Sequence, residues 1–434
     1  MRGMSNPATP LRRHALKRLG LCAALSVAGL PAAHAATRLE IVGVGATRVT
    51  VIVAPFEGDV AGAGADDSHA EAAFHRVLAQ DFERSGLLRP LEATPELAGA
   101  MDARVQGTVQ PLPDGQLSVR WTLWDPLRRV ELATQQLKAT PAERRLVAHR
   151  IADTVQELLT GVRGVNATRI AYIVQDGARH LLKVADADGH NHRTALTSHE
   201  SIISPAWSPQ GDELAYVSFE QGRAQVWVQA LKTGRRQALA AYRGSNSAPA
   251  WSPDGRQVAF ASSRDGTTQL FIVARDGGSP RRVAPSAAID TEPAWAPDGR
   301  SLYFTSDRGG SPQIYRVGLE SGVVERVSFD AYSVSPSISP QGDKLAYISN
   351  QEGALRVVVK TLASGSVKTV TRSVEDERPS FAPNGRLLVY ATREGRRDLL
   401  MTSSIDGRVQ TRLLGTLADV REPAWGPWPE ARTG

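Results

Sequence analysis

Short apolar runs separated by turn sequences dominate the chain from about residue 168 onward. A representative stretch reads Val258-Ala259-Phe260, the turn Arg264-Asp265-Gly266, the run Leu270 to Val273 and the turn Asp276-Gly277. Asp and Gly suit tight turns because Asp bonds its own backbone and Gly accepts the left-handed conformation. The pattern predicts short β-strands joined by tight turns, with no helix between them.

One motif recurs through this region: a Pro, a small residue, a large apolar residue, a small residue and a second Pro. Its six copies begin 43 or 44 residues apart, at Pro205, Pro249, Pro293, Pro336, Pro379 and Pro423. Four short strands in a repeat of this length are typical of one blade of a β-propeller. We expect the large residue of each copy to pack between blades: Trp207, Trp251, Trp295, Ile338, Phe381 and Trp425.

The two ends of the repeat region determine the number of blades. Nothing but a short tail, residues 429–434, follows the last motif, whereas the strand predicted at 169–174 has no motif before it. The last motif therefore supplies the missing first strand of the blade that begins at residue 168. This pairing closes a ring of six blades over residues 168–428 and leaves no exposed sheet edge at the joint.

Residues 36–160 have a different pattern, which predicts a small α+β domain. Two amphipathic helices are expected, the first over about 69–85 and the second from the cap at Thr140 to Gly161. Strands are expected at 49–54, 104–109, 117–124 and 130–137, the last three as an antiparallel meander with one buried face. Residues 161–167 form a short linker to the propeller, which restricts motion between the two parts.

The first 35 residues have the composition of an export signal. Arg12, Arg13, Lys17 and Arg18 precede an apolar run from Leu19 to Leu30, and Ala35 and Ala36 flank the expected cleavage point. The run is too short for a permanent membrane anchor, so the mature protein is expected to be soluble. Export by the general pathway and export by the twin-arginine pathway both remain open, because Arg12-Arg13 fits either signal.

Removing this segment changes the charge and the cysteine content. Without its five basic residues the chain has 46 Lys and Arg against 45 Asp and Glu, so its surface is not that of a nucleic-acid-binding protein. Cys22 is the only cysteine and leaves with the segment. The mature chain therefore has no disulfide, thiolate metal site or cysteine nucleophile.

Candidate chemistry is sparse. No Gly-x-Ser-x-Gly nucleophile elbow is present. Asp186, Asp188, His190 and His192 surround one turn and could hold a metal, but we favour a solvated hairpin turn; Glu71 and His75 are interpreted as an exposed helix face. We predict no catalytic residue, no metal and no cofactor, and expect the ring to present its loops to partner proteins.

The domain order and the linker carry a resemblance to a known family. Leu159-Thr160-Gly161-Val162-Arg163-Gly164 leads into Thr168 to Val174, and the six Pro-x-Trp-Ser-Pro-Asp-Gly-like motifs follow. Together these features resemble the TolB family of the Tol-Pal system. The resemblance implies a non-enzymatic periplasmic adaptor that binds the outer-membrane lipoprotein Pal and the inner-membrane protein TolA. It would maintain outer-membrane integrity and support outer-membrane constriction during division.

The resemblance also implies contact residues. It places Ser245, Ala248 and Thr291 in the Pal contact, and equivalent loops add Glu292, Glu377 and Arg421. It assigns TolA binding to the first residues of the mature chain, where Leu39, Glu40, Ile41 and Val42 could add as a strand. Two alternatives remain, a periplasmic hydrolase or lyase with its site in the axial channel and a carbohydrate-binding propeller.

Overall fold

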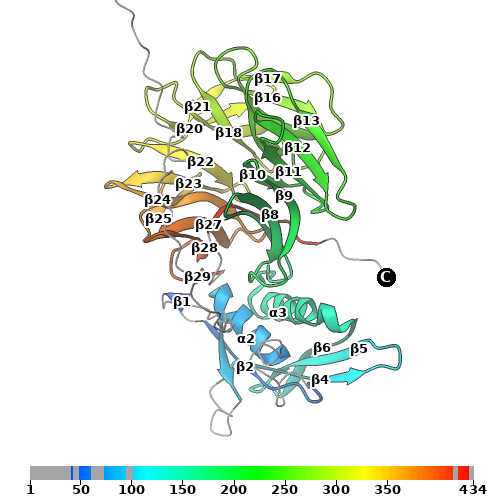
Figure 1. Cartoon of the computed structure of the whole chain (residues 1–434). Coiled ribbons are helices and arrows are strands. Elements are labelled where there is room, and N and C mark those ends of the chain that lie inside the picture. Colours follow the sequence, from blue (N-terminus) through cyan, green and yellow to red (C-terminus); the bar gives the residue numbers. More distant parts are fainter. Residues whose placement is uncertain (1–40, 43–47, 60–72, 94–100, 414–418, 430–434) are drawn as a thin grey trace, which may run out of the picture. The chain divides into compact units, whose positions relative to one another are not determined.

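The computed structural model describes residues 41–42, 48–59, 73–93, 101–413 and 419–429. It contains a five-stranded mixed sheet with two helices, followed by six blade sheets (Figure 1). This confirms the predicted fold class, an α+β domain before a six-bladed β-propeller. None of the helices in these residues is long and apolar enough to cross a membrane.

The N-terminal sheet has the order β3-β2-β4-β5-β6. Its strands are β2 (Val49–Val53), β3 (Leu88–Glu92), β4 (Ala103–Pro111), β5 (Leu117–Asp125) and β6 (Val130–Ala139). β4, β5 and β6 form the predicted antiparallel meander, while β2 pairs in parallel with both β3 and β4. The sequence did not indicate β3, because Pro90 disfavours a strand; Pro is tolerated there since β3 is an edge strand.

Two helices cover one face of this sheet. α2 (Phe74–Ser85) and α3 (Arg144–Thr160) each end at a glycine in the left-handed conformation, Gly86 and Gly161. Thr140 and Glu143 form the predicted capping box before α3, through a short 3-10 turn over Pro141–Glu143. The expected start of the first helix near residue 69 lies outside the described residues.

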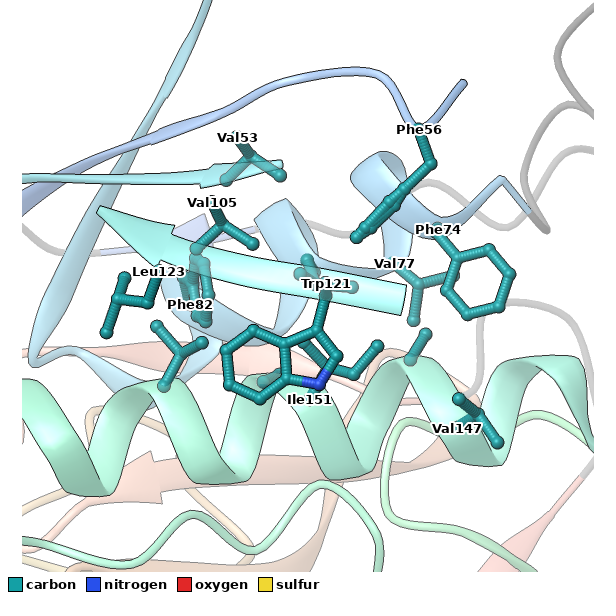
Figure 2. Close-up of a cluster of buried hydrophobic side chains, with 14 of the residues drawn as sticks. Val53, Phe56, Phe74, Val77, Phe82, Val105, Trp121, Leu123, Val147 and Ile151 are labelled. Atoms are coloured by element: carbon teal, nitrogen blue, oxygen red, sulfur yellow. The ribbon is translucent and has the colours of Figure 1, made fainter. Parts of the chain in front are cut away.

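The core of this domain lies between the helices and the sheet. Trp121 on β5 is fully buried and packs in one cluster with Phe74 and Phe82 of α2 and Ile151 of α3 (Figure 2). Val51, Val105 and Leu123 close the sheet side of the same cluster. Alternate residues of β5 therefore face this core, as expected for a sheet with one covered face.

Each propeller blade is a four-stranded antiparallel sheet, taken in chain order except for one blade that borrows its first strand from the C-terminus. The first three blades are β30 (Val420–Trp425), β7 (Arg169–Asp176), β8 (Arg179–Asp186) and β9 (Arg193–Ser198); β10 (Ile202–Trp207), β11 (Glu213–Ser218), β12 (Gln225–Ala230) and β13 (Arg236–Ala240); and β14 (Asn246–Trp251), β15 (Gln257–Ser262), β16 (Gln269–Ala274) and β17 (Arg281–Val283). The others are β18 (Asp290–Trp295), β19 (Ser301–Ser306), β20 (Gln313–Gly318) and β21 (Val324–Arg326); β22 (Ser333–Ile338), β23 (Lys344–Gln351), β24 (Ala354–Thr361) and β25 (Val367–Thr369); and β26 (Glu377–Phe381), β27 (Leu387–Glu394), β28 (Arg397–Ser404) and β29 (Gln410–Arg412).

The large residue of each motif packs between blades, as predicted. Trp251 lies in one buried cluster with Ala215 and Val217 of the preceding blade, and Phe381 lies with Ile348 and Val357 of its own predecessor. The indole N–H groups add specific contacts. Trp251 donates to the Ala206 carbonyl (3.2 Å), Trp207 to the Ala424 carbonyl and Trp295 to the Ala250 carbonyl. Trp425 donates to the Thr168 hydroxyl oxygen. Each indole thus finds the hydrogen-bond partner that a buried Trp requires.

Ring closure follows the predicted pairing. β30 pairs with β7 in antiparallel register from Val420 opposite Val174 to Trp425 opposite Ile170. A further strand, β1 (Ile41–Val42), pairs with the outer strand β29 and makes that blade five-stranded. The backbone of the N-terminal segment therefore lies along one blade edge.

Deleting residues 420–434 should open the ring, whereas deleting residues 430–434 should not. The longer deletion removes β30, so β7 keeps only β8 as a partner and the buried cluster between the blades loses Val420 and Trp425. An unpaired central edge promotes association with other chains. We expect size-exclusion chromatography to show aggregates for the longer deletion and a monomer for the shorter one. A monomer with a Tm within about 2 °C of the parent for both would contradict this account of closure.

Candidate functional site

Six residues, one from each blade, adopt the left-handed backbone conformation just before the first Pro of the motif. Their φ angles lie between 46° and 58°. We name them the pre-proline ring: Ser204, Ala248, Glu292, Ser335, Arg378 and Glu422. Positive φ is uncommon for residues other than Gly, so its recurrence in all six blades marks a constraint of the repeat.

A β-bulge in every first strand explains this conformation. The pairing of first and second strands skips over the pre-proline residue and the Pro in all six blades, for example between Ile203 and Ala206 in the strand β10. Pro has no N–H to give to the ladder, so the ladder is interrupted where Pro stands. A bulge bends the strand and redirects a side chain.

Three ring residues from adjacent blades are linked by hydrogen bonds to a charged side chain. Arg378 donates from one nitrogen to Glu422 Oε2 (2.6 Å) and to Ser204 Oγ (2.7 Å). Glu422 Oε2 also accepts the Ser204 backbone N–H (2.9 Å). Charge-assisted bonds of this kind are stronger than neutral ones, so they fix both the side chains and the strained backbone of Ser204.

Glu292 plays the corresponding role in two other blades. Its carboxylate accepts from the Ser335 backbone N–H (2.9 Å), from Ser335 Oγ (3.0 Å) and from Thr305 Oγ1 (2.8 Å). Ala248 contributes no polar group to the ring. Every polar residue of the ring is therefore bonded to a neighbouring blade, in two groups: Arg378, Glu422 and Ser204, and Glu292 with Ser335.

The ring lies at a cavity of about 350 Å³ formed by the first strands of the blades. The lining includes four ring residues and the motif residues Trp207, Trp251, Phe381 and Trp425. Glu292 and Arg378 are the ionisable side chains among these described lining residues, and both are already bonded. The cavity thus offers a shaped, partly apolar recess rather than a free acid and base.

The residues predicted to contact Pal fall into two groups around this ring. Glu292 and Ala248 are ring members, although Ala248 is buried and Glu292 half-buried. Ser245 is exposed in the loop before β14, and Thr291 is half-buried beside Glu292. Glu377 and Arg421 each lie one residue before a ring position, so the ring members of those two blades are Arg378 and Glu422 instead.

The residues chosen from the sequence for the Pal contact do not include four ring residues, Ser204, Ser335, Arg378 and Glu422. The signal that could have found them is the position immediately before the first Pro of each motif. It carries a polar residue in five of the six copies, the exception being Ala248.

A group of charges surrounds Glu377 next to the ring. Arg421 and Arg393 both donate to the buried carboxylate of Asp398, at 2.6 Å and 2.8 Å. The Glu377 side chain reaches solvent, yet desolvation by the surrounding walls raises its pKa above the ordinary value; repulsion from Glu422 and Asp398 adds to the shift, and attraction to Arg421 and Arg393 reduces it. The ionised form of Glu377 is therefore disfavoured where it stands.

The residues predicted to bind TolA are only partly described. Ile41 and Val42 form β1, whose backbone pairs with Thr411 and Gln410 of β29. Leu39, Glu40 and the expected cleavage site at Ala35 and Ala36 lie outside the described residues.

The interpretation of the turn after β8 as a solvated hairpin is wrong for one of its residues. Asp188 is only 6% exposed. It accepts hydrogen bonds from Arg145 of α3 (2.6 Å) and from the His190 backbone N–H (3.0 Å). The sequence could not reveal this, because Arg145 and Asp188 are 43 residues apart and meet only in the folded chain.

Comparison with known sequence families gives two matches that together cover most of the chain. Residues 37–132 match the family described as the TolB amino-terminal domain, and residues 156–429 match the TolB beta propeller domain. The crystal structure of TolB from Acinetobacter baumannii superposes with a TM-score of 0.81 at 33% identity, covering 90% of this chain and 99% of that one.

Curated relatives give the same result. A protein of Polaromonas sp. (strain JS666 / ATCC BAA-500) is 47% identical over 238 residues, which are 52% of this chain and 54% of that protein. One from Aromatoleum aromaticum is 46% identical over 247 residues, 54% of this chain and 56% of that protein. Both are named Tol-Pal system protein TolB. The chain spans about half the length of the curated relatives it matches.

Replacing Glu377 by Gln should stabilise the protein at neutral pH. A carboxyl whose pKa is raised on folding loses stability as the pH rises above its unfolded value, and the neutral amide avoids this loss. We expect the Tm at pH 7 to rise by up to about 2 °C, and the gain to vanish below pH 4.5, the ordinary pKa of the side chain.

The matched control is Glu375→Gln, because Glu375 is exposed and pairs with Arg393 at 3.1 Å. This variant should show no gain at pH 7. Equal melting temperatures for Glu377→Gln and the parent at pH 7 would show that the charge on Glu377 does not lower the stability of the free protein.

Proposed function

The chain belongs to the TolB family, and on that premise we propose that it is a non-enzymatic periplasmic adaptor of the Tol-Pal system. Its partners would be the lipoprotein Pal and the inner-membrane protein TolA. In this role it would help to maintain outer-membrane integrity and support constriction of the outer membrane during division.

The pre-proline ring and its surroundings are the observation that carries the Pal assignment. The ring is rigid, because its polar members are bonded between blades. Around it stand the exposed Ser245, the half-buried Thr291 and the charged Arg421 and Glu377. A fixed recess with a polar, mixed-charge rim suits a protein partner that makes many hydrogen bonds across a wet interface.

The charge on Glu377 supports the same proposal. An ionised carboxylate held at a crowded position is disfavoured in the free protein. A cationic or hydrogen-bond-donating group of a partner would remove that penalty on binding. The free energy recovered there would add to the affinity of the complex.

β1 supports the proposal for TolA. It lies along β29 by two paired residues, Ile41 opposite Thr411 and Val42 opposite Gln410. A pairing this short is weak, so a partner strand can compete for the segment. TolA would add to residues 39–42 once they leave the blade.

Coupling between the two partners requires two states of this segment, one docked on β29 and one released. If Pal binding favours one of them, it changes the affinity for TolA by the same factor by which TolA changes the affinity for Pal. Pal held on the propeller would be kept from peptidoglycan. The segment would then report Pal occupancy to TolA.

Arginine at the rim should block Pal binding. Ser245→Arg and Thr291→Arg place a bulky cation beside the ring, and we expect each to weaken the Kd for purified Pal at least about tenfold, or 1.4 kcal/mol, in isothermal titration calorimetry. The matched control is Ser364→Arg, an exposed Ser in the turn between β24 and β25, at the opposite end of its blade. Unchanged affinity for both rim variants would place the Pal site elsewhere, and binding of no Pal by the parent would refute the adaptor function.

Removing residues 36–45 should abolish TolA binding and leave the Tm almost unchanged, because the described part of this segment, Ile41–Val42, makes only a two-residue pairing. A second variant, Ile41→Cys with Thr411→Cys in the mature chain, would hold β1 on β29 when oxidised. We expect TolA to bind the reduced form and not the oxidised form in a pull-down, with Thr411→Cys alone as control. A fall in Tm of more than about 4 °C on deletion would mean that the segment is structural; equal TolA binding by both redox forms would exclude competition with β29.

A further inference from the structure

A fully buried histidine stands where the two N-terminal helices meet the first propeller blade. His149 of α3 has no exposed surface. Its Nδ1 lies 2.6 Å from Asp81 Oδ2 of α2, and its Nε2 lies 3.2 Å from Asp188 Oδ2 in the turn after β8. One imidazole ring thus lies between carboxylates from two parts of the fold.

Further charged and polar groups extend this contact. Arg84 of α2 donates to Asp81 (2.6 Å) and to the Asn166 side-chain oxygen (2.7 Å), and Arg145 donates to Asp188 (2.6 Å). Asp153 of α3 accepts from the backbone N–H groups of Asn166 and Ala167 at 2.8 Å and 3.0 Å. The network therefore joins α2, α3, the segment 161–167 and the first blade.

The segment 161–167 is held close to α3. At Gly164, an added Cβ would lie 2.2 Å from Asp153 Oδ1 and 2.6 Å from its Cα, so a side chain does not fit there. The Gly164 carbonyl accepts from the Trp428 indole at 2.9 Å, and Thr168 Oγ1 accepts from the Trp425 indole at 2.8 Å. Trp428, just after β30, thus contacts the segment, and Trp425 of β30 contacts the residue that follows it.

Charge balance favours a protonated ring on His149. A neutral imidazole has one N–H and can donate to only one of its two flanking carboxylates, whereas the imidazolium can donate to both. Burial lowers the pKa of His149, but Asp81 and Asp188 together raise it to about 10. The other groups that face it are Arg84, Arg145 and Asp153 from the helices and Asp186 and His190 from the blade.

We propose that positively charged His149 is the centre of a charge latch that holds the helices of the N-terminal domain on the first propeller blade. The latch comprises His149, Asp81, Asp188, Arg84, Arg145 and Asp153. Removing the charge of His149 leaves two cations, Arg84 and Arg145, against the three carboxylates of the latch, so one buried negative charge loses its counterpart. The contact between helices and blade then opens before either part unfolds.

A metal ion is the other occupant that this cluster could accept. One ligand atom each of His149, Asp186 and Asp188 lie within 4.8 Å of one another. The Arg145 guanidinium, however, already bonds the Asp188 oxygen that faces both His149 and His190. A divalent cation beside that guanidinium would be repelled by it, so the geometry favours the ion-pair latch.

Hydrogen exchange of the full mature protein, with His149→Gln as the test variant, measures the opening directly. We expect backbone exchange of residues 162–168 and 186–192 to rise at least about tenfold in the variant, while exchange of the propeller strands β15 and β19 stays unchanged. The matched control is Arg150→Gln, which removes an exposed cation one residue away on the same helix. If His149→Gln does not fold, Arg145→Gln should give the same pattern. Equal exchange in the variants and the parent would overturn the latch.

The pH dependence gives a second readout. Because the folded pKa of His149 lies above its ordinary value of 6.5, the stability from its charge is complete below pH 6.5 and is lost as the pH rises through about 10. The difference in Tm between the parent and His149→Gln should therefore be large at pH 6.5 and shrink toward zero at pH 10.5. A constant difference would mean a packing role only. Stoichiometric zinc in the purified protein, together with a rise in Tm on adding zinc chloride, would also overturn the latch in favour of a metal site.

Discussion

Packing between blades is the constraint on which the rest of this molecule depends. A four-stranded blade buries both faces only when it has a neighbouring blade on each side. Here the large apolar residue of each motif fills the interface between two blades. Trp251 and Phe381 show the arrangement, each lying against the strands of the preceding blade. Because each blade needs two neighbours, the series must close, and the pairing of β30 with β7 closes it.

The same motif produces the candidate partner site as a consequence of its proline. Pro interrupts the ladder of every first strand, and the resulting bulge places the preceding residue in the left-handed conformation at the cavity. Strained residues of this kind persist only where their surroundings hold them. Here the carboxylates of Glu292 and Glu422 accept the backbone N–H groups of Ser335 and Ser204, respectively. Fold and site therefore share one set of positions.

The sequence was sufficient for the features that depend on spacing. Equal intervals between motifs predicted six blades and their closure, and the cap at Thr140 with Gly161 predicted the second helix. Features that depend on long-range contact were missed or misplaced. Pro90 disfavoured the edge strand β3 in the sequence pattern, and Asp188 was expected to be solvated because its partner Arg145 lies far away in sequence.

The two clusters of charge in this protein differ in how completely they are satisfied. Around His149, the three carboxylates of the latch, Asp81, Asp188 and Asp153, each have a cation or a backbone N–H within bonding distance. Beside the pre-proline ring, Arg393 and Arg421 both donate to Asp398 and not to Glu377. The pKa of Glu377 is therefore raised, and its ionised form is disfavoured next to Glu422 and Asp398. A complete cluster can gain little from a partner, whereas an incomplete one can. Under the proposed function, this difference is why the rim of the ring, and not the helix–blade contact, is the surface on which a partner would bind.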